Sequence, residues 1–299
     1  MMQNVKVTQK GEKGPVPARI FFMLARSSPT AVVFRRGPSK WVQLLKWNTD
    51  SDSFEPGQWF HGKIYERRSD LSPDGSMLLY FAQKIEGRTL HDVEYTYAWT
   101  AVSRPPFLTA LALWPKGDCW HGGGSFQDDK TVILNHKPDV ARPHPNHIPQ
   151  GLEVILRNHV HGEDDPIFSE RLQRDGWEIK QEWVLEYRGY PLMYTTPQPE
   201  IREKRNLDGS LLIRLTRSVE GLDYAEEFAV SSGDGSVLFQ IERASWADWD
   251  HRGRMVFARD GKIFEGQVDD RAALNTRELV DLNSAKPVPI RSPNWASQW

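Results

Sequence analysis

A chain of 299 residues in which 39% are hydrophobic and 11% aromatic can bury a sizeable core, which excludes a disordered or fibrous protein. The 38 basic and 40 acidic residues give a formal net charge of −2 at pH 7. We therefore expect no nucleic-acid partner, because surfaces that bind nucleic acids carry an excess of basic residues. The single cysteine, Cys119, excludes an intrachain disulfide and is typical of a reducing compartment.

The N-terminal segment, residues 1–17, is expected to be irregular and lacks the order of a secretory signal. The apolar run that follows it, Ile20–Ala25, is too short for the hydrophobic part of a signal peptide and precedes no clear cleavage site. No stretch of the sequence approaches the ~20 apolar residues that span a bilayer. We therefore expect a soluble, cytoplasmic protein with no membrane partner.

Short apolar segments recur along residues 18–283 with few helix candidates between them, of which Asp270–Val280 is the best. Many segments are apolar on both faces, which is typical of sheets packed against other sheets, as in a sandwich or a propeller. They are rich in β-branched and aromatic residues and are bounded by turn-forming residues. In chain order the predicted strands are Ala31–Arg35, Trp41–Trp47, Met77–Ala82, Glu94–Thr100, Phe107–Trp114, Thr131–Leu134, Leu152–Leu156, Leu211–Thr216, Val237–Ile241, Met255–Ala258 and Lys262–Val268.

Three polar turns that end in glycine each precede a buried strand. They are "SPDGSMLLYF" at 72–81, "NLDGSLLIRL" at 206–215 and "DHRGRMVFAR" at 250–259. Asp-Gly favours a tight turn because glycine accepts a positive φ and aspartate bonds its own backbone. The interval from Gly209 to Gly253 is close to one propeller blade of ~40–45 residues, which indicates an internal repeat.

The stretch "SDLSPDGSMLLYFA" at 69–82 resembles the Ser-Pro-Asp-Gly turn of TolB-like and WD40-like β-propeller repeats. The segment Ala244–Asn283, which contains "RDGKIFEGQV", resembles a whole terminal blade of that group. The resemblance covers two or three blades. It departs from the repeats at Gly253, which follows Arg252 rather than an aspartate, and over residues 116–199, where no blade pattern is clear.

The resemblance implies one all-β domain, a β-propeller over residues 18–283, with five irregular four-stranded blades; six blades are the alternative. The third blade contains an insertion around residues 137–170. A Pro- and Ser-rich tail follows at residues 284–299, and we expect its tryptophans, Trp295 and Trp299, to dock on the body. The blades are expected at Arg19–Arg67, Arg68–Pro115, Lys116–Pro199, Glu200–Arg243 and Ala244–Asn283.

The 12 tryptophans have two interpretations. Flat aromatic faces stack on sugar rings or on exposed bases, but large side chains also fill the wedges between blades. We favour core packing for the six that lie inside strand patterns, namely Trp41, Trp47, Trp99, Trp114, Trp246 and Trp249. Trp120, beside a run of glycines, is the exception.

The glycine-rich stretch "GDCWHGGGSF" at 117–126 is the most unusual local composition. Consecutive glycines allow a close backbone approach or an anion-binding nest, although the lysine and spacing of a P-loop are absent. The candidate binding residues are Trp120, His121, Gly122, Gly123 and Gly124. Cys119 and His121 lie two residues apart and could form a nucleophile pair, but an inert thiol is the favoured interpretation.

The stretch from Arg142 to Pro166 is the richest in metal-ligating side chains. His159 and His161 alternate onto one face of an extended segment, and Asp164 would complete a site with three ligands. No HExxH motif is present, and prolines mark the start of the stretch as a loop, so a solvated insertion is the favoured interpretation. We therefore expect no cofactor, with a divalent metal as the alternative.

No local motif selects a catalytic pair among the 40 acidic residues. A glycosidase would need carboxylates in the central channel, where Asp118, Glu182, Asp248 and Asp250 could lie; turn capping or surface charge is the favoured alternative. The sequence thus favours a non-enzymatic module that binds a protein or peptide partner on one rim. The alternative is a hydrolase acting on a glycan or lactone in the channel, with or without a metal, and a small molecule or glycan could also bind without catalysis.

Overall fold

The computed structural model describes residues 16–37, 39–157, 164–187, 194–218, 224–232, 236–268 and 274–299. It confirms the all-β class, because helices in these residues are limited to α1 (Ile167–Arg174), α2 (Asn294–Ser297) and two 3-10 turns, η1 (Thr89–His91) and η2 (Pro138–Val140). Neither α-helix is long and apolar enough to cross a membrane.

Two antiparallel sheets of four strands each begin the fold, and their strands pair in chain order. The first sheet consists of β1 (Arg19–Leu24), β2 (Thr30–Arg36), β3 (Trp41–Asn48) and β4 (Ser53–His61). The second consists of β5 (Lys63–Leu71), β6 (Leu78–Gln83), β7 (Ala98–Ser103) and β8 (Ala112–Pro115).

The middle of the chain forms less regular sheets. The third sheet has β9 (Gly124–Phe126), β10 (Thr131–Leu134) and β11 (Glu153–Leu156), with β11 parallel to β10. The fourth has β12 (Trp177–Gln181), β15 (Glu200–Arg205), β16 (Leu211–Ser218), β17 (Tyr224–Ser231) and β18 (Val237–Ile241). A hairpin of β13 (Val184–Tyr187) and β14 (Tyr194–Gln198) lies between β12 and β15 in the chain.

The fifth sheet is again a regular antiparallel meander and returns the chain to the first. It consists of β19 (Ala244–Trp249), β20 (Met255–Arg259), β21 (Lys262–Val268) and β22 (Leu274–Asp281). β1 contacts both β19 and β5, and Ser245 Oγ donates to the carbonyl of Ile20 at 2.7 Å. Asn283, just after β22, accepts a hydrogen bond from the backbone N–H of Ala18 at 3.0 Å.

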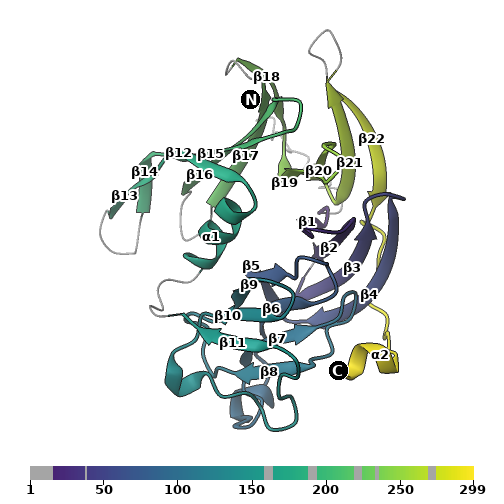
Figure 1. Cartoon of the computed structure of the whole chain (residues 1–299), viewed down its shortest axis with the longest axis vertical. Helices are drawn as coiled ribbons and strands as arrows, with labels where there is room; N and C mark the ends of the chain where they lie inside the picture. The colour runs from purple at the N-terminus through teal and green to yellow at the C-terminus, as the bar shows by residue number, and fades with distance from the viewer. Residues whose placement is uncertain are drawn as a thin grey trace, which may run out of the picture.

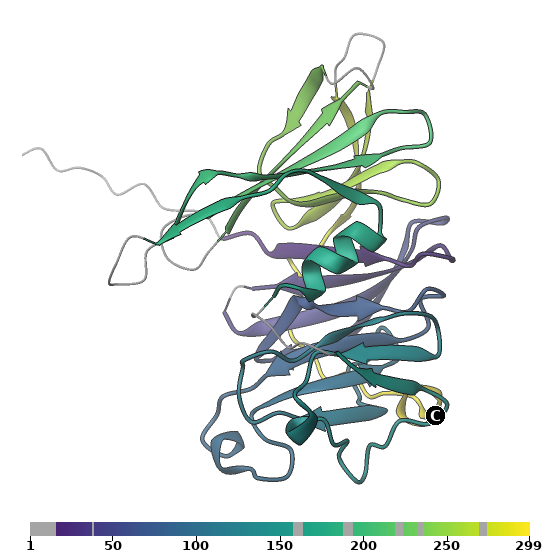
Figure 2. The same ribbon diagram turned by 60° about the vertical axis from the view of Figure 1, so that its left-hand side comes forward.

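The sheets follow one another around a central region, which makes the arrangement propeller-like (Figure 1). β5 contacts β9, β17 contacts β19, and α1 contacts strands of the second, third and fourth sheets. In Figure 2 the sheets are seen stacked in layers, with α1 at mid-height between those above and below it. The helix buries Ile167, Phe168, Arg171 and Leu172, one stripe of its surface.

Aromatic packing joins the sheets where they meet. Trp246 of β19 lies 4.6 Å from Phe21, 5.8 Å from Phe228 and 6.4 Å from Trp177 between ring centroids. Four of the six tryptophans assigned to the core are buried, namely Trp47, Trp114, Trp246 and Trp249. Trp41 and Trp99 are half-buried, so for these two the core interpretation holds only in part.

The three glycine-ended turns have one geometry. Gly75, Gly209 and Gly253 have φ values of +75°, +90° and +74°, and each donates its N–H to the carbonyl three residues earlier. The third turn lacks an Asp-Gly pair because its aspartate stands earlier: Asp250 Oδ1 accepts the N–H groups of Arg252 and Arg254. The hydrogen-bonding aspartate therefore lies earlier in the third turn than in the other two, while the glycine keeps its positive φ.

Three sequence-based assignments were wrong in whole or in part. The strand expected at Glu94–Thr100 begins only at Ala98 and continues to Ser103 as β7. The best helix candidate, Asp270–Val280, is strand β22 in its described part, because those residues pair with β21 and pairing outweighs a weak helical pattern. The strand expected at Phe107–Trp114 begins only at Ala112. It is preceded by a turn whose central residues are Pro105 and Pro106, which have no N–H to donate to a strand.

The tail docks on the body, as expected. Gln58 Nε2 donates to the carbonyl of Ile290 at 3.0 Å, and the rings of Trp295 and Phe107 lie 5.5 Å apart. Trp299 packs against the core of the second and third sheets. Of the segment expected to be irregular at the N-terminus, only residues 16 and 17 are described.

Candidate functional site

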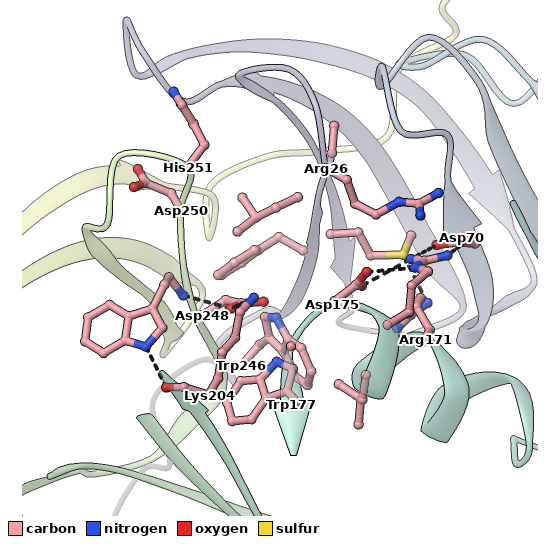
Figure 3. A pocket seen from close by; sticks show the side chains of 18 of the residues that line it. Arg26, Asp70, Arg171, Asp175, Trp177, Lys204, Trp246, Asp248, Asp250 and His251 are labelled. Carbon is pink, nitrogen blue, oxygen red and sulfur yellow. Dashed lines mark hydrogen bonds and ion pairs between the residues drawn. The ribbon is translucent and has the colours of Figure 1, made fainter. Parts of the chain in front are cut away.

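A pocket of about 440 Å³ opens where the first, fourth and fifth sheets meet α1. We call it the central pocket. It is lined by Phe21, Phe22, Met23, Leu24, Ala25, Arg26, Asp70, Arg171, Leu172, Arg174, Asp175, Gly176, Trp177, Lys204, Trp246, Asp248, Trp249, Asp250 and His251. Figure 3 shows Arg26, Asp70, Arg171 and Asp175 on one side and Lys204, Asp248 and Asp250 on the other.

The apolar part of the pocket is a continuation of the core. Between 3% and 9% of the surface is exposed to solvent in Phe21, Met23, Trp246 and Trp249. Trp177, which also lines the pocket, is fully buried. The pocket therefore presents only small exposed parts of packed aromatic side chains rather than broad free faces. Such a floor is held in place by its packing and does not need to rearrange on binding.

One wall carries a short ion pair between two sheets. Lys204 Nζ lies 2.6 Å from Asp248 Oδ1, which also accepts the N–H of Trp249 at 2.8 Å. The indole N–H of Trp249 in turn donates to the carbonyl of Lys204 at 3.0 Å. Burial raises the pKa of the Asp248 carboxyl, and the ammonium of Lys204 opposes this shift without cancelling it.

The opposite wall is built around Arg174 at the end of α1. Its guanidinium donates two hydrogen bonds to Asp70, at 2.6 and 3.0 Å, and another to Asp175 at 2.8 Å. Asp70 also accepts the N–H of Phe126 at 2.7 Å. Although burial opposes it, the contact with these carboxylates raises the pKa of Arg174 further above its ordinary value, so the arginine stays charged.

Two further arginines line the same wall without a carboxylate partner among the described residues. Arg171 Nη1 donates to the carbonyls of Glu66, at 3.0 Å, and Ser69, while its Nη2 is buried and makes no hydrogen bond. Arg26 Nη2 donates to the carbonyl of Phe126 at 3.1 Å. Burial, together with the charge of the neighbouring Arg174, lowers the pKa of Arg26.

The rim of the pocket is closed by a contact between two turns. His251 Nε2 lies 2.8 Å from Asp50 Oδ1, and its Nδ1 lies 3.0 Å from Thr49 Oγ1. The next residue inward, Asp250, is ion-paired with Arg254 at 2.8 Å. The turn that enters β20 is thereby tied to the turn between β3 and β4.

The glycine-rich stretch lies outside the lining of this pocket. Trp120 is 66% exposed, and His121 has a φ of +60°. Gly122 and Gly123 also have positive φ values, but their N–H groups donate to Asn135 O and Thr100 Oγ1 within the chain. A Cβ atom on Gly123 would lie 2.1 Å from the carbonyl oxygen of Arg68.

Close packing on Phe81 of β6 thus accounts for the glycine at 122, and close packing on Arg68 of β5 for the glycine at 123. Gly124 is similarly close to the backbone of β10. Binding at this loop stays a prediction. The Cys119 thiol has a raised pKa because it is desolvated, which is the opposite of what an activated nucleophile requires.

The expected metal ligands are only partly described. His159 and His161 lie outside the described residues. Asp164 is described, and its Oδ1 lies 3.0 Å from Nε of the buried Arg68. Within the part of the chain that the structure describes, no group of three or more His, Cys, Asp and Glu side chains is placed to hold a metal ion.

Of the four carboxylates considered for the channel, two line the central pocket: Asp248 and Asp250. Asp118 instead pairs with Lys116 at 2.9 Å and caps the following turn, and Glu182 is outside the lining. Sequence reasoning missed the charged residues of the opposite wall, Arg26, Asp70, Arg171, Arg174 and Asp175. No local motif joins them, since they come from the ends of three separate elements.

Comparison with known proteins adds little to this geometry. No family model matches the chain. No curated protein matches it either. Among solved structures it is similar to the endo-arabinase from Bacteroides thetaiotaomicron, with 11% sequence identity and a TM-score of 0.18 over 92% of this chain and 75% of that chain. A similarity at this score carries no argument about activity.

Proposed function

We propose that the protein binds a small polar molecule in the central pocket. The observation that supports this most is the composition of the lining, in which fixed charged groups surround a floor of packed, mostly buried aromatic side chains. Ligand sites are commonly concave and largely preformed, with a few polar groups that fix orientation. The ion pairs Lys204–Asp248 and Arg174–Asp70 supply such groups on facing walls.

The rigidity of these groups favours binding over a purely structural role. Asp248 and Asp70 each accept a backbone N–H in addition to their ion pair, so neither carboxylate needs to reorient on binding. Preorganised polar groups lose little entropy when a ligand arrives. The pocket volume suits a molecule of the size of one or two sugar rings, and a glycan unit is one such ligand.

A panel of small polar molecules, read by tryptophan fluorescence and by thermal shift, tests this proposal. We expect compounds that stabilise the protein to bind at least about tenfold more weakly to Lys204→Gln, since an ion-paired wall group is lost. Lys180→Gln is the matched control, because Lys180 lies on the neighbouring strand β12 outside the pocket lining. Equal binding to both variants, or no binding by any compound, would overturn the proposal.

Hydrolysis of a glycan or lactone is the second candidate, favoured by one observation. Asp248 lines the pocket and its pKa is raised by burial, which is the property required of a carboxyl that donates a proton near neutral pH. Turnover of aryl glycosides or aromatic lactones should fall by about 100-fold or more in Asp248→Asn. Asp118→Asn, at a residue outside the pocket lining, should leave this turnover unchanged. If the unmodified protein turned over none of these substrates, hydrolysis would be ruled out and only the binding proposal would stand.

We further propose that the five larger sheets are five blades of one propeller, with α1 between the third and the fourth. The support is the order of contacts from β1 to β5 to β9 and from β17 to β19 and back to β1. The third and fourth blades then have three and five strands instead of four. A protein or peptide partner on one rim stays a prediction, because it rests on the fold class alone.

A further inference from the structure

We infer that the central pocket binds an uncharged ligand with neighbouring hydroxyl groups, as a sugar or another polyol has, and that these hydroxyls bind to Lys204 and Asp248. The inference rests on the proposed function, because it names the chemical class of the molecule bound there. It is carried by the unused hydrogen-bonding groups of one wall, in a pocket whose acidic and basic residues balance.

Acidic and basic side chains balance in the lining of the pocket. There are four of each, namely Arg26, Arg171, Arg174 and Lys204 against Asp70, Asp175, Asp248 and Asp250. All four acidic residues are in ion pairs, which are Asp70–Arg174, Asp175–Arg174, Asp248–Lys204 and Asp250–Arg254.

The two arginines of the lining that form no ion pair with a described residue are not uncompensated cations. Both Arg26 and Arg171 are stabilised by the nearby charges of Asp70 and Asp175. Arg26 is also stabilised by Asp129, and Arg171 by Glu66. A ligand with a net charge therefore meets no excess of the opposite charge in this pocket, and its affinity must come from other groups.

The wall formed by β15 and β19 offers such groups. Asp248 Oδ1 accepts from Lys204 Nζ and from the N–H of Trp249, whereas Oδ2 accepts no hydrogen bond from a described residue. Lys204 uses one of the three N–H donors of its ammonium. The indole N–H of Trp246 has no acceptor among the described residues. One acceptor and donors of two kinds are thus unused.

These groups face the pocket. Trp246 and Asp248 lie two residues apart on β19 and therefore point to the same face of the strand, and Figure 3 shows them with Lys204 on one side of the pocket. The side chains of Lys204 and Asp248 are 17% and 11% exposed. Asp248 Oδ2 and Trp246 Nε1 keep contact with solvent, whereas Nε1 of Trp177 is fully covered. A ligand in the pocket can reach them.

Hydroxyl groups fit this wall better than a charged group does. Because a hydroxyl both donates and accepts, one can donate to Asp248 Oδ2 while its neighbour accepts from Lys204 Nζ. Such hydrogen bonds to ionised groups are stronger than those between neutral groups, and the ion pair stays intact. A carboxylate or phosphate would be attracted by Lys204 but repelled by Asp248 beside it, and an ammonium would meet the reverse. Two adjacent hydroxyls therefore use both members of the pair.

A panel of sugars tests the class of ligand. Isothermal titration of the full chain at pH 7 uses glucose, galactose, mannose, xylose, arabinose, myo-inositol, cellobiose and maltose, with glucuronate, galacturonate, glucosamine and galactosamine as charged counterparts. We expect a neutral member to bind most tightly, and its affinity to change by less than about twofold as NaCl is raised. Removing either of two adjacent hydroxyls from that sugar should weaken binding about tenfold or more, because a group of the wall is left unpaired.

Removing one member of the ion pair should create a charge preference that the unmodified protein lacks. Asp248→Asn leaves Lys204 unpaired and should favour the uronates over the amino sugars by about tenfold, and Lys204→Gln should favour the amino sugars by a similar factor. Asp118→Asn and Lys180→Gln, at residues outside the pocket lining, are the matched controls and should show neither preference. Thermal unfolding confirms that each variant folds.

The failure of this inference can be told from that of the proposed function. If a charged sugar binds the unmodified protein tenfold more tightly than every neutral one, if the deoxy sugars bind equally well, or if neither variant acquires a preference, the inference is wrong while the pocket remains a binding site. The same holds if no sugar binds but another compound of the wider panel does. If no compound of either panel binds, the proposed function fails together with the inference.

Discussion

Stability at acid pH is set in part by His136, a histidine that the fold keeps neutral. His136 is fully buried between the second and third sheets, and its Nε2 lies 2.8 Å from Thr100 Oγ1. Its Nδ1 lies 3.0 Å from the carbonyl of Val140. Since a carbonyl only accepts, Nδ1 carries the proton and Nε2 accepts from the hydroxyl, which is the pattern of a neutral imidazole.

Burial lowers the pKa of His136 from 6.5 to about 4. The unfolded chain therefore binds a proton between pH 6.5 and 4 that the folded chain does not, and the free energy of unfolding falls as the pH falls through this range. A shift of this size corresponds to about 3 kcal/mol, all of it lost below pH 4 and none of it above pH 6.5.

Urea unfolding of the unmodified protein and of His136→Gln, from pH 3.5 to 8, measures this contribution. Glutamine can donate to Val140 and accept from Thr100 but does not titrate. At pH 8 the difference in free energy of unfolding between the two proteins reflects packing alone. On going to pH 4 this difference should shift by about 3 kcal/mol in favour of the variant. Parallel curves over the whole range would refute the assignment of a neutral buried histidine.

Three further changes test the packing of the fold. Trp246→Ala should lower the free energy of unfolding by about 3–5 kcal/mol in urea titrations, because Trp246 joins three sheets, whereas Trp120→Ala at an exposed site should change it by less than about 0.5 kcal/mol. Gly123→Ala should cost more stability than Gly209→Ala: both glycines have positive φ, but only Gly123 is pressed against backbone, so equal thermal shifts would contradict the close packing. Truncation after residue 287 should lower the unfolding free energy by about 2 kcal/mol by calorimetry, because the contacts of the tail with Gln58 and Phe107 are lost; an unchanged melting temperature would show that docking contributes nothing.

Much of the fold could be predicted from the sequence, because the patterns that indicate its turns and strands involve only residues close together in the chain. Glycine at 75, 209 and 253 marks turns through a backbone requirement that involves only a few neighbours. Segments such as Leu78–Gln83 are apolar on both faces because sheets cover them on both sides. In the third and fourth sheets only some strands gave such a signal, such as Thr131–Leu134 and Leu211–Thr216. How these sheets are assembled could not be predicted, since β11 pairs in parallel with β10 and α1 contacts strands of three sheets.

The site was not accessible in the same way. Asp248 and Asp250 stood out only as two of several carboxylates, and nothing in their neighbourhood indicates that Lys204 would approach from another sheet. The opposite wall depends on the position of α1, which brings Arg171 and Arg174 to β1 and β5. These contacts are set by tertiary packing, which leaves no fixed spacing in the chain.

The glycine-rich stretch shows that one unusual composition can have a structural cause as well as a functional one. Its composition drew attention as a binding loop, yet the structure uses Gly122 and Gly123 to bring the loop against Phe81 and Arg68. A run of glycines indicates that backbone must come close to something. Here that neighbour is another strand of the same protein.

A crystal structure of the protein soaked with the compound of the panel that binds most tightly tests the central claim most directly. We predict ligand density in the central pocket, in contact with Lys204 or Asp248. An empty pocket in crystals that bind the ligand elsewhere, for example at Trp120 and the adjoining glycines, would contradict it.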